Sequence, residues 1–309
     1  MATESESRSA VSTVNERLSR LLRKYRETFL GKYSLVTPTL LVVAVLIVFP
    51  TLILFSYSLN PFSQGRIQSS LTIAHYVEAF TTPLYRTILL RTIKIAAIVT
   101  VVDFLIGFPL AYAAVRKGGW VGKLIVVATL APLTIDLVVR SFGWFILLNG
   151  SGVVVSTLTV LGLTSQSTAP QLLFNETGII IGLAHVMLPF MVFPIVNVMH
   201  TIPHSLEEAA RNLGANRFTV FIHVLVPLAL PGISAGVLIT FVVSLASYVT
   251  PAMLGGSVKV LPVIITNTFT STSNWPFASA LSMILVGVAL LVIIGYQRAL
   301  KAMGGVGGI

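Results

Sequence analysis

Residues 200–227 read HTIPHSLEEAARNLGANRFTVFIHVLVP and lie between two long apolar segments of the chain. Ser205 is a suitable helix N-cap, and Glu208 follows it at the spacing of a capping-box partner. Gly214 fits the left-handed position that follows a helix end, where a side chain would clash. We therefore expect a helix that starts at Pro203, His204 and Ser205, continues through the charged residues and ends near Gly214.

A second short helix is expected directly after this turn, with Phe218, Phe221 and Ile222 on its apolar side. Pro227 then falls in the first turn of the following apolar segment, where its missing N–H group costs little. A compact helix–turn–helix in this position has a shape suited to docking on another protein. An ordinary capped connection between two membrane spans is the alternative interpretation.

The composition of the chain indicates an integral membrane protein. Of its 309 residues, 55% are hydrophobic and 10% are charged, whereas soluble domains carry about 25% charged residues. So small a number of charged groups excludes an ordinary soluble globule. The chain has no cysteine, which excludes disulfides, thiol chemistry and thiolate metal sites.

Six segments are long and apolar enough to cross a membrane. A helix needs about 20 mostly apolar residues to cross about 30 Å of hydrocarbon. Segment 153–163 is apolar but too short, so we expect a re-entrant or interfacial piece within the loop 149–176. The sequence predicts an all-α membrane protein whose six transmembrane helices are 35–57, 92–115, 123–148, 177–198, 226–249 and 277–297.

The distribution of basic residues predicts the orientation, because Lys and Arg near span ends gather on the cytosolic side. An even number of spans puts both termini on one side of the membrane. That side holds the basic residues of the tail 1–34 together with Arg116, Lys117, Lys123, Arg211, Arg217, Arg298 and Lys301. The opposite side keeps only Arg66, Arg86, Arg91, Lys94 and Lys259. We therefore expect both termini and the loop 200–227 in the cytosol, and the loop 149–176 outside.

Residues 1–34 are too polar and too long for a secretory signal. Apolar residues at helical spacing, with arginines between them, predict a basic amphipathic helix on the cytosolic leaflet. A solvated basic tail that only sets the topology is the alternative. The transmembrane domain is expected at 35–300, followed by a short C-terminal tail at 301–309.

Seven residues of the loop stand at the spacing of a known pattern: Glu208, Ala209, Ala210, Gly214, Val224, Val226 and Pro227. Together they resemble the EAA loop of type I ABC importer permeases. The family pattern ends in Ile-x-Leu-Pro, so Val224 and Val226 are mild departures that leave the polarity unchanged. The resemblance extends over roughly residues 35 to 300.

This resemblance implies that the loop forms a coupling helix seated in a groove of a nucleotide-binding subunit. Glu208 would pair with a basic group there, Ala209 and Ala210 would permit close packing, and Gly214 would allow the turn. Pro227 completes the coupling motif. The chain is then the permease subunit of an ATP-driven, binding-protein-dependent importer in the bacterial inner membrane.

Four further segments are similar to the spermidine/putrescine permease subfamily: Gly107–Ala111, Arg140–Trp144, Leu188–Met191 and Ser247–Gly256. They imply a small, polyamine-like cargo, although relatives in that subfamily are similar to importers of opines, phosphonates and ferric iron. The implied partners are a cytosolic ABC ATPase dimer, an extracytoplasmic solute-binding protein and a second permease, which is either another protein or a second copy. Membrane lipid surrounds the chain, and no nucleic acid is expected.

Charged and aromatic side chains within the spans are candidates for the translocation path, since an ionised group there costs about 3 kcal/mol. Asp136 and Arg140 are four residues apart and are expected to share a helix face, either as a structural clamp or with one member facing the cargo. Asp103 has no local partner, so another subunit, a proton or a wet cavity must satisfy it. Trp144 and Tyr248 suit either the lipid interface or cation–π contact with cargo.

No catalytic residues, metal site or cofactor are predicted. The chain lacks the Gly-x-x-x-x-Gly-Lys-Ser/Thr sequence of a Walker loop, its histidines are dispersed, and no acid–base or nucleophile cluster is present. ATP hydrolysis is therefore expected in a partner subunit. A self-contained secondary transporter is the main rival, but the chain shows no pair of matching interrupted spans. A membrane-embedded enzyme is the weaker rival.

Overall fold

The computed structural model describes residues 37–302, apart from positions 64, 69 and 164–169. The predicted amphipathic segment 1–34 therefore lies outside the described residues, as do residues 303–309. The chain divides into two units, residues 1–56 and 57–309. Helix α3 (Thr37–Ser58), apolar along almost its whole sequence, supplies the described part of the first unit.

The second unit is built from helices and one short antiparallel pair of strands, β1 (Phe62–Ser63) and β2 (Arg66–Ile67). Its first helices are α4 (Ala74–Thr81), α5 (Pro83–Lys117), α6 (Gly119–Leu130), the 3-10 helix η2 (Ala131–Thr134), α7 (Leu137–Leu148) and α8 (Val153–Val160). These are followed by α9 (Glu176–Thr201), α10 (His204–Asn212), α11 (Arg217–Val220), the π-helix η3 (Phe221–Leu225), α12 (Val226–Ala246), α13 (Val249–Leu254), α14 (Leu261–Thr270) and α15 (Trp275–Ala302).

The prediction of six membrane spans is confirmed. The helical segments long and apolar enough to cross are Thr37–Ser58, Pro83–Lys117, Leu137–Val160, Glu176–Thr201, Arg217–Ala246 and Trp275–Ala302. The last of these includes Lys301, so the predicted tail 301–309 begins inside a helix. Helix α5, with 35 residues, is about 52 Å long. It is therefore longer than the hydrocarbon layer, and its two ends reach beyond it.

The predicted span 123–148 is wrong as a single helix, because the helix breaks between α6 and α7. Pro132 lies in η2 at the break, and proline has no N–H group for the helical hydrogen bond. Asp136 then caps the next helix: its carboxylate accepts from the amides of Val138 at 2.8 Å and Val139 at 3.4 Å. The span found instead consists of α7 and α8.

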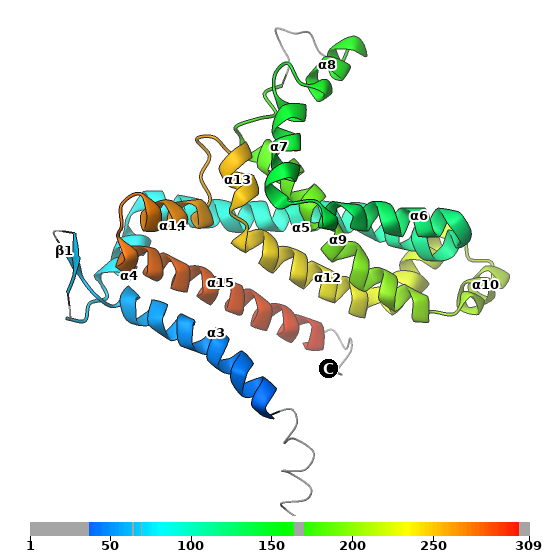
Figure 1. Cartoon of the computed structure of the whole chain (residues 1–309). Coiled ribbons are helices and arrows are strands. Elements are labelled where there is room, and N and C mark those ends of the chain that lie inside the picture. Colours follow the sequence, from blue (N-terminus) through cyan, green and yellow to red (C-terminus); the bar gives the residue numbers. More distant parts are fainter. Residues whose placement is uncertain (1–36, 64, 69, 164–169, 303–309) are drawn as a thin grey trace, which may run out of the picture. The chain divides into compact units, whose positions relative to one another are not determined.

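This capping role also corrects the predicted pairing of Asp136 with Arg140. Asp136 precedes α7 rather than lying within it, and none of the ion pairs in the described part of the chain joins these two residues. The segment 153–163, expected to be re-entrant or interfacial, forms α8, which Figure 1 shows beyond the end of α7. Most of it belongs to the third candidate span.

Helices α5, α9 and α12 form the packing core of the second unit and lie side by side (Figure 1). Their buried side chains meet in one hydrophobic cluster, represented by Phe108 on α5, Met191 on α9 and Ile233 on α12. Successive contacts run in the same direction along α5 and α9 and in opposite directions along α9 and α12. Helix α9 therefore runs parallel to α5 and antiparallel to α12.

Close approach of α9 and α12 depends on two glycines of α12 that are four residues apart. A Cβ atom at Gly232 would lie 2.6 Å from the carbonyl oxygen of Pro194, and one at Gly236 would lie 2.9 Å from that of Met191. Glycines at this spacing let the backbones of two membrane helices touch. Any larger residue at either position must push the helices apart.

We expect Gly232→Val to lower the stability of the folded protein by about 1–3 kcal/mol, because the added methyl groups overlap the backbone of α9. The measurement is the thermal midpoint of the purified protein in detergent. Gly287→Val is the matched control, since Gly287 also lies within a helix and a Cβ atom added there would have no neighbour within 4 Å. Equal midpoints for the two variants would contradict close helix packing at Gly232.

Candidate functional site

The loop between α9 and α12 consists of α10 and α11 joined by a tight turn at Gly214. Gly214 has a φ of +88°, in the left-handed region that favours glycine. Its N–H donates to the carbonyl of Arg211 at 2.9 Å, and the N–H of Ala215 donates to that of Ala210 at 3.1 Å. These two bonds form a Schellman motif. The predicted helix end at Gly214 is therefore confirmed.

The first helix starts within the predicted segment 203–205, but the predicted N-cap, Ser205, is wrong. Helix α10 begins at His204 with Pro203 as its N-cap, and no side chain caps it. Proline suits this place because its φ is fixed and it has no N–H group to satisfy. Ser205 consequently lies inside the helix, and Glu208 is not a capping-box partner. Within the described residues the Glu208 carboxylate makes no hydrogen bond or ion pair, and the residue is exposed.

Helix α11 leads into α12 through a π-helical turn. The side chain of Asn216 caps α11 by accepting from the amide of Thr219 at 2.7 Å. The N–H of Val226 then bonds to the carbonyl of Phe221, five residues earlier. Pro227, one residue further on, lies in the first turn of α12 as predicted. A proline ring crowds the carbonyl four residues before it, and a wider turn relieves that contact.

Several large apolar side chains of the loop are exposed. Leu213 is 89% exposed and Phe218 is 71% exposed, and Leu206 and Ile222 are also exposed. Only Phe221 of the predicted apolar set packs inward, onto the α5–α9–α12 cluster. These four exposed apolar side chains in one short loop are candidates for an interaction surface. The sequence pattern does not single out Leu213, although its position directly before the turn glycine leaves it little to pack against.

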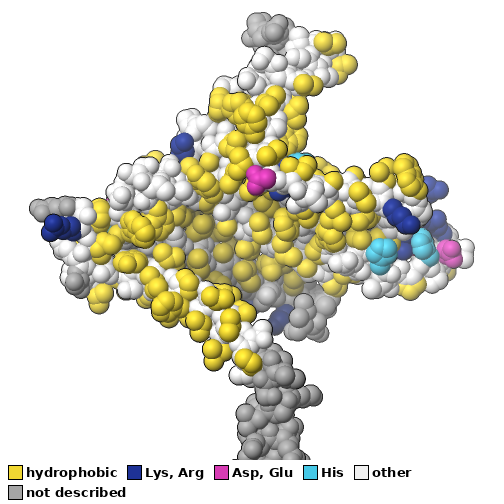
Figure 2. Space-filling model, viewed as in Figure 1, with side chains coloured by type: hydrophobic (Ala, Val, Ile, Leu, Met, Phe, Trp, Pro, Cys, Tyr) yellow, Lys and Arg dark blue, Asp and Glu magenta, His cyan; other side chains and the backbone are white. Residues whose placement is uncertain are grey.

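Ala209 is exposed beside Glu208, and Ala210 is partly exposed. Figure 2 shows that the end of the second unit around α10 gathers basic, acidic and histidine side chains, whereas α12 and α15 present hydrophobic ones. We call the exposed residues Leu206, Glu208, Ala209, Leu213 and Phe218 the loop surface. Of the EAA-like pattern, Glu208, Ala209, Gly214 and Pro227 are thus exposed.

Glu207, the neighbour of Glu208, is buried and holds the loop to the core. Its Oε1 lies 2.5 Å from Nε of Arg116 on α5, and Arg116 also donates from Nη2 to the carbonyl of Ile202 at 3.1 Å. The Arg116–Glu207 pair is an ion pair by distance, without the alignment of a hydrogen bond. Arg211 approaches the other carboxylate oxygen at 3.7 Å. The sequence gives no signal that separates Glu207 from Glu208, because only the packing against α5 distinguishes them.

Asp103 is completely enclosed in the core on α5. It is 0% exposed, and neither carboxylate oxygen has a hydrogen-bond partner among the described residues. Because the chain itself covers Asp103, a second subunit has no access to it in this conformation. The hydroxyls of Thr240 and Ser244 on α12 are likewise buried without a partner. Gly107 of α5 and Gly236 of α12 both face Met191. Asp103 lies one helical turn before the first glycine, and Thr240 lies one turn after the second. Because the two helices run in opposite directions, Asp103 and Thr240 lie at the same level of the core.

The other path candidates lie on α7 and next to α13. Trp144 packs edge-on against His185 of α9, with ring centroids 5.6 Å apart. On the same helix, Nε and Nη1 of Arg140 are buried without a hydrogen-bond partner in the described part of the chain. Tyr248 is partly exposed at the start of α13. The structure therefore brings Trp144 and α9 together, and leaves Asp136 exposed at the break before α7.

Three of the five basic residues predicted for the side opposite the loop, Arg91, Lys94 and Lys259, lie close together around the half of α5 away from Arg116. Glu176, at the start of α9, pairs with Arg91 at 3.3 Å and with Lys94 at 2.5 Å. Arg91 also donates to the carbonyl of Lys259 at 3.3 Å. Arg116 stands at the opposite end of the same helix. Arg91 and Arg116 are thus about 38 Å apart along the axis of α5.

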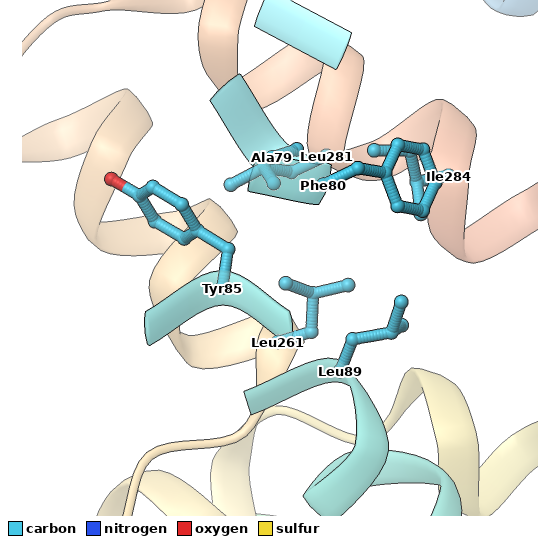
Figure 3. Close-up of a pocket in the computed structure, with 7 residues that line it drawn as sticks. All are labelled: Ala79, Phe80, Tyr85, Leu89, Leu261, Leu281 and Ile284. Atoms are coloured by element: carbon cyan, nitrogen blue, oxygen red, sulfur yellow. The ribbon is translucent and has the colours of Figure 1, made fainter. Parts of the chain in front are cut away.

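A small pocket between α4, α5, α14 and α15 does not suit a charged cargo. Its lining residues are Ala79, Phe80, Tyr85, Leu89, Leu261, Leu281 and Ile284. Figure 3 shows that the Tyr85 hydroxyl points away from the other lining side chains, so the pocket is lined by carbon. In the described part of the chain, no group of His, Asp and Glu residues is arranged to hold a metal ion.

Comparison with known proteins gives a consistent result. Residues 103–301 match the family model described as binding-protein-dependent transport system inner membrane component. The spermidine/putrescine transport system permease protein PotB of Haemophilus influenzae is 33% identical over 235 residues, which cover 75% of this chain and 81% of that protein. PotB of Escherichia coli is 31% identical, over 72% of this chain and 80% of its own length.

A solved structure has the same fold. It is the crystal structure of a bacterial alginate ABC transporter in complex with an alginate pentasaccharide-bound periplasmic protein. The matching chain superimposes with a TM-score of 0.69 and 16% identity, over 94% of this chain and 100% of that one. The arrangement of helices described above is therefore that of an ABC transporter membrane subunit.

We expect Gly214→Val to open the turn of the loop, because a left-handed backbone costs a β-branched residue about 1–2 kcal/mol. Hydrogen exchange at the amides of Gly214 and Ala215 should become about tenfold faster. Gly214→Asn is the matched control, since asparagine tolerates this conformation and no atom lies within 4 Å of an added Cβ. Equal protection in both variants would show that the turn does not depend on a left-handed residue.

Proposed function

Because the chain belongs to the family of binding-protein-dependent transport system inner membrane components, and is therefore a permease of an ABC importer rather than an enzyme, we propose that the loop 200–227 is its docking site for a cytosolic ATPase. Family membership also removes the self-contained secondary transporter as a rival. The ATPase dimer hydrolyses ATP, and an extracytoplasmic solute-binding protein delivers the cargo. A second permease, or a second copy of this chain, completes the path.

The loop surface is the observation that carries this proposal. Glu208 and Ala209 are exposed, and the Glu208 carboxylate has no partner in the described part of the chain. A basic group of the ATPase supplies that partner, and the small side chain of Ala209 lets the partner approach closely. Leu213 and Phe218 provide apolar area that a docked protein removes from water. Because Glu207 fixes one face of α10 to α5, the opposite face, with Glu208 and Ala209, is free to dock.

Glu208→Ala is expected to reduce transport at least tenfold while membrane insertion and the fold are retained, because the lost carboxylate lies on the surface. The measurement is uptake by the complex reconstituted with its ATPase, alongside co-purification of the ATPase. Glu78→Ala is the matched control, since Glu78 is an exposed carboxylate on α4, near the other end of α5. Normal uptake and normal ATPase binding by Glu208→Ala would remove Glu208 from the coupling role.

We place the loop surface, both termini and Arg116 on the cytosolic side, in the bacterial inner membrane. One support is the excess of Lys and Arg residues in the segments predicted for the cytosolic side. The other is that Arg91, Lys94 and Lys259 lie close together around the half of α5 away from Arg116. The chain has no cysteine, so single cysteines introduced at Glu208 and Lys259 report their own exposure. An impermeant thiol reagent labels the first only from the cytosolic side if this orientation holds, and labelling of position 208 from outside contradicts it.

For the cargo we propose a polyamine. The support is the similarity to two PotB proteins named as spermidine/putrescine permeases. Asp103 is enclosed in this conformation, so it contacts a cation only in a conformation that opens the core, whereas the aromatic faces of Trp144 and Tyr248 suit a passing cation. One observation favours an anionic cargo instead, of the opine or phosphonate class: the guanidinium of Arg140 is partly buried and unpaired within the described residues.

The complex is therefore expected to import labelled putrescine or spermidine, and Asp103→Asn is expected to reduce that uptake severalfold, since it removes the enclosed carboxylate. Arg140→Gln distinguishes the rival, because it should spare a cationic cargo and abolish import of an anionic one. Uptake of neither polyamine, together with normal transport of another cargo by Asp103→Asn, would make both the cargo and the path assignment wrong.

A further inference from the structure

The loop 200–227 is attached to α5, a helix that neither precedes nor follows it directly in the sequence. In sequence it joins α9 to α12, yet its two ends both contact α5. The first contact is the ion pair between Glu207 of α10 and Arg116 in the last turn of α5, with N and O atoms 2.5 Å apart. The second contact lies at the π-helical turn, where the ring of Phe221 meets two rings of α5.

The ion pair is buried, unlike the other pairs in the described part of the chain. The side chains of Arg116 and Glu207 are 7% and 4% exposed, whereas the Glu176 pairs and Arg211 are substantially open to solvent. A buried charge that loses its partner is strongly unfavourable, so the two groups stay together. Arg116 also holds the carbonyl of Ile202, the residue that ends α9. One guanidinium thus joins the ends of α5 and α9 to the first turn of α10.

The aromatic contact supports the same connection by different chemistry. Phe221 packs edge-on against Phe108, with centroids 5.0 Å apart, and against Tyr112, with centroids 5.8 Å apart. Phe108 belongs to the core cluster, and Tyr112 packs against that cluster one turn closer to Arg116. Both halves of the loop are therefore attached to the same last three turns of α5.

We propose that Arg116 and Glu207 are positioning residues that fix α10 on the end of α5, so that a displacement of α10 by its docked partner passes directly into α5. The inference rests on the proposal that the loop docks an ATPase. Helix α5 carries Asp103 about 20 Å from Arg116 along its axis. The attachment at Arg116 thus links the docking surface to the enclosed acid of the core through α5, in which Pro109 lies between the two residues.

The test is the number of cargo molecules transported per ATP hydrolysed, measured on the complex reconstituted with its ATPase. Arg116→Gln and Glu207→Gln are each expected to lower this ratio at least threefold while the ATPase still co-purifies, since the loop surface is unchanged. The charge-reversed double variant, Arg116→Glu with Glu207→Arg, should recover much of the ratio that either reversal alone loses. Lys94→Gln is the control and should keep the wild-type ratio, because it breaks an exposed ion pair of α5 that lies outside the loop.

A purely structural role gives a different result. In that case the variants lower the yield or the thermal midpoint, but the folded complexes keep the wild-type ratio, and the inference is overturned. If the glutamine variants do not assemble, Arg116→Lys, which retains the charge but not the planar guanidinium, is measured in their place with the same expected loss. Failure of the docking proposal is recognised separately: there Glu208→Ala also transports normally. Loss of coupling in Glu208→Ala with a normal ratio in every Arg116 and Glu207 variant overturns this inference alone.

Discussion

Backbone contact between α9 and α12 at Gly232 and Gly236 sets the positions of the other core elements. The hydrophobic effect does not drive two membrane helices together in lipid, so the contact depends on van der Waals packing at short range. Helix α5 packs against both α9 and α12, and the three helices enclose one hydrophobic cluster. The loop 200–227 begins at the end of α9 and returns into α12, so its place follows from the same contact.

Charge satisfaction explains most of the acidic residues near this core. Asp136 serves backbone amides, Glu176 is neutralised by Arg91 and Lys94, and Glu207 by Arg116. Each of these acids stands at a helix end, where a partner is easy to place. Asp103 differs because it lies in the middle of α5 and its carboxylate has no hydrogen-bond partner among the described residues. An unpaired carboxyl group is costly in a hydrocarbon layer, and such residues in membrane proteins are usually functional.

Sequence reasoning predicted the helical class, the number of spans and the loop turn, because these depend on hydropathy and on local backbone preferences. Gly214 and Pro227 were predictable for that reason. The break at Pro132 was not, since its apolar neighbours hide it within a continuous hydropathic segment. Glu207 and Glu208 are equivalent in sequence, and only contact with α5, some 90 residues earlier in the chain, makes one buried and the other exposed. The ring contact between Trp144 and His185 also joins residues far apart in the sequence, so local patterns do not predict it.

The π-helical turn at Phe221–Leu225 inserts one residue into an otherwise continuous helix from Arg217 to Ala246. One residue corresponds to a rotation of about 100° around the helix axis. A regular α-helix in place of this turn would rotate α11 by more than a quarter revolution relative to α12. Phe221 would leave Phe108 and Tyr112 in the process. The extra residue of this turn thus sets the rotation of α11 about the axis of α12, and with it the contact of Phe221 with the rings of α5.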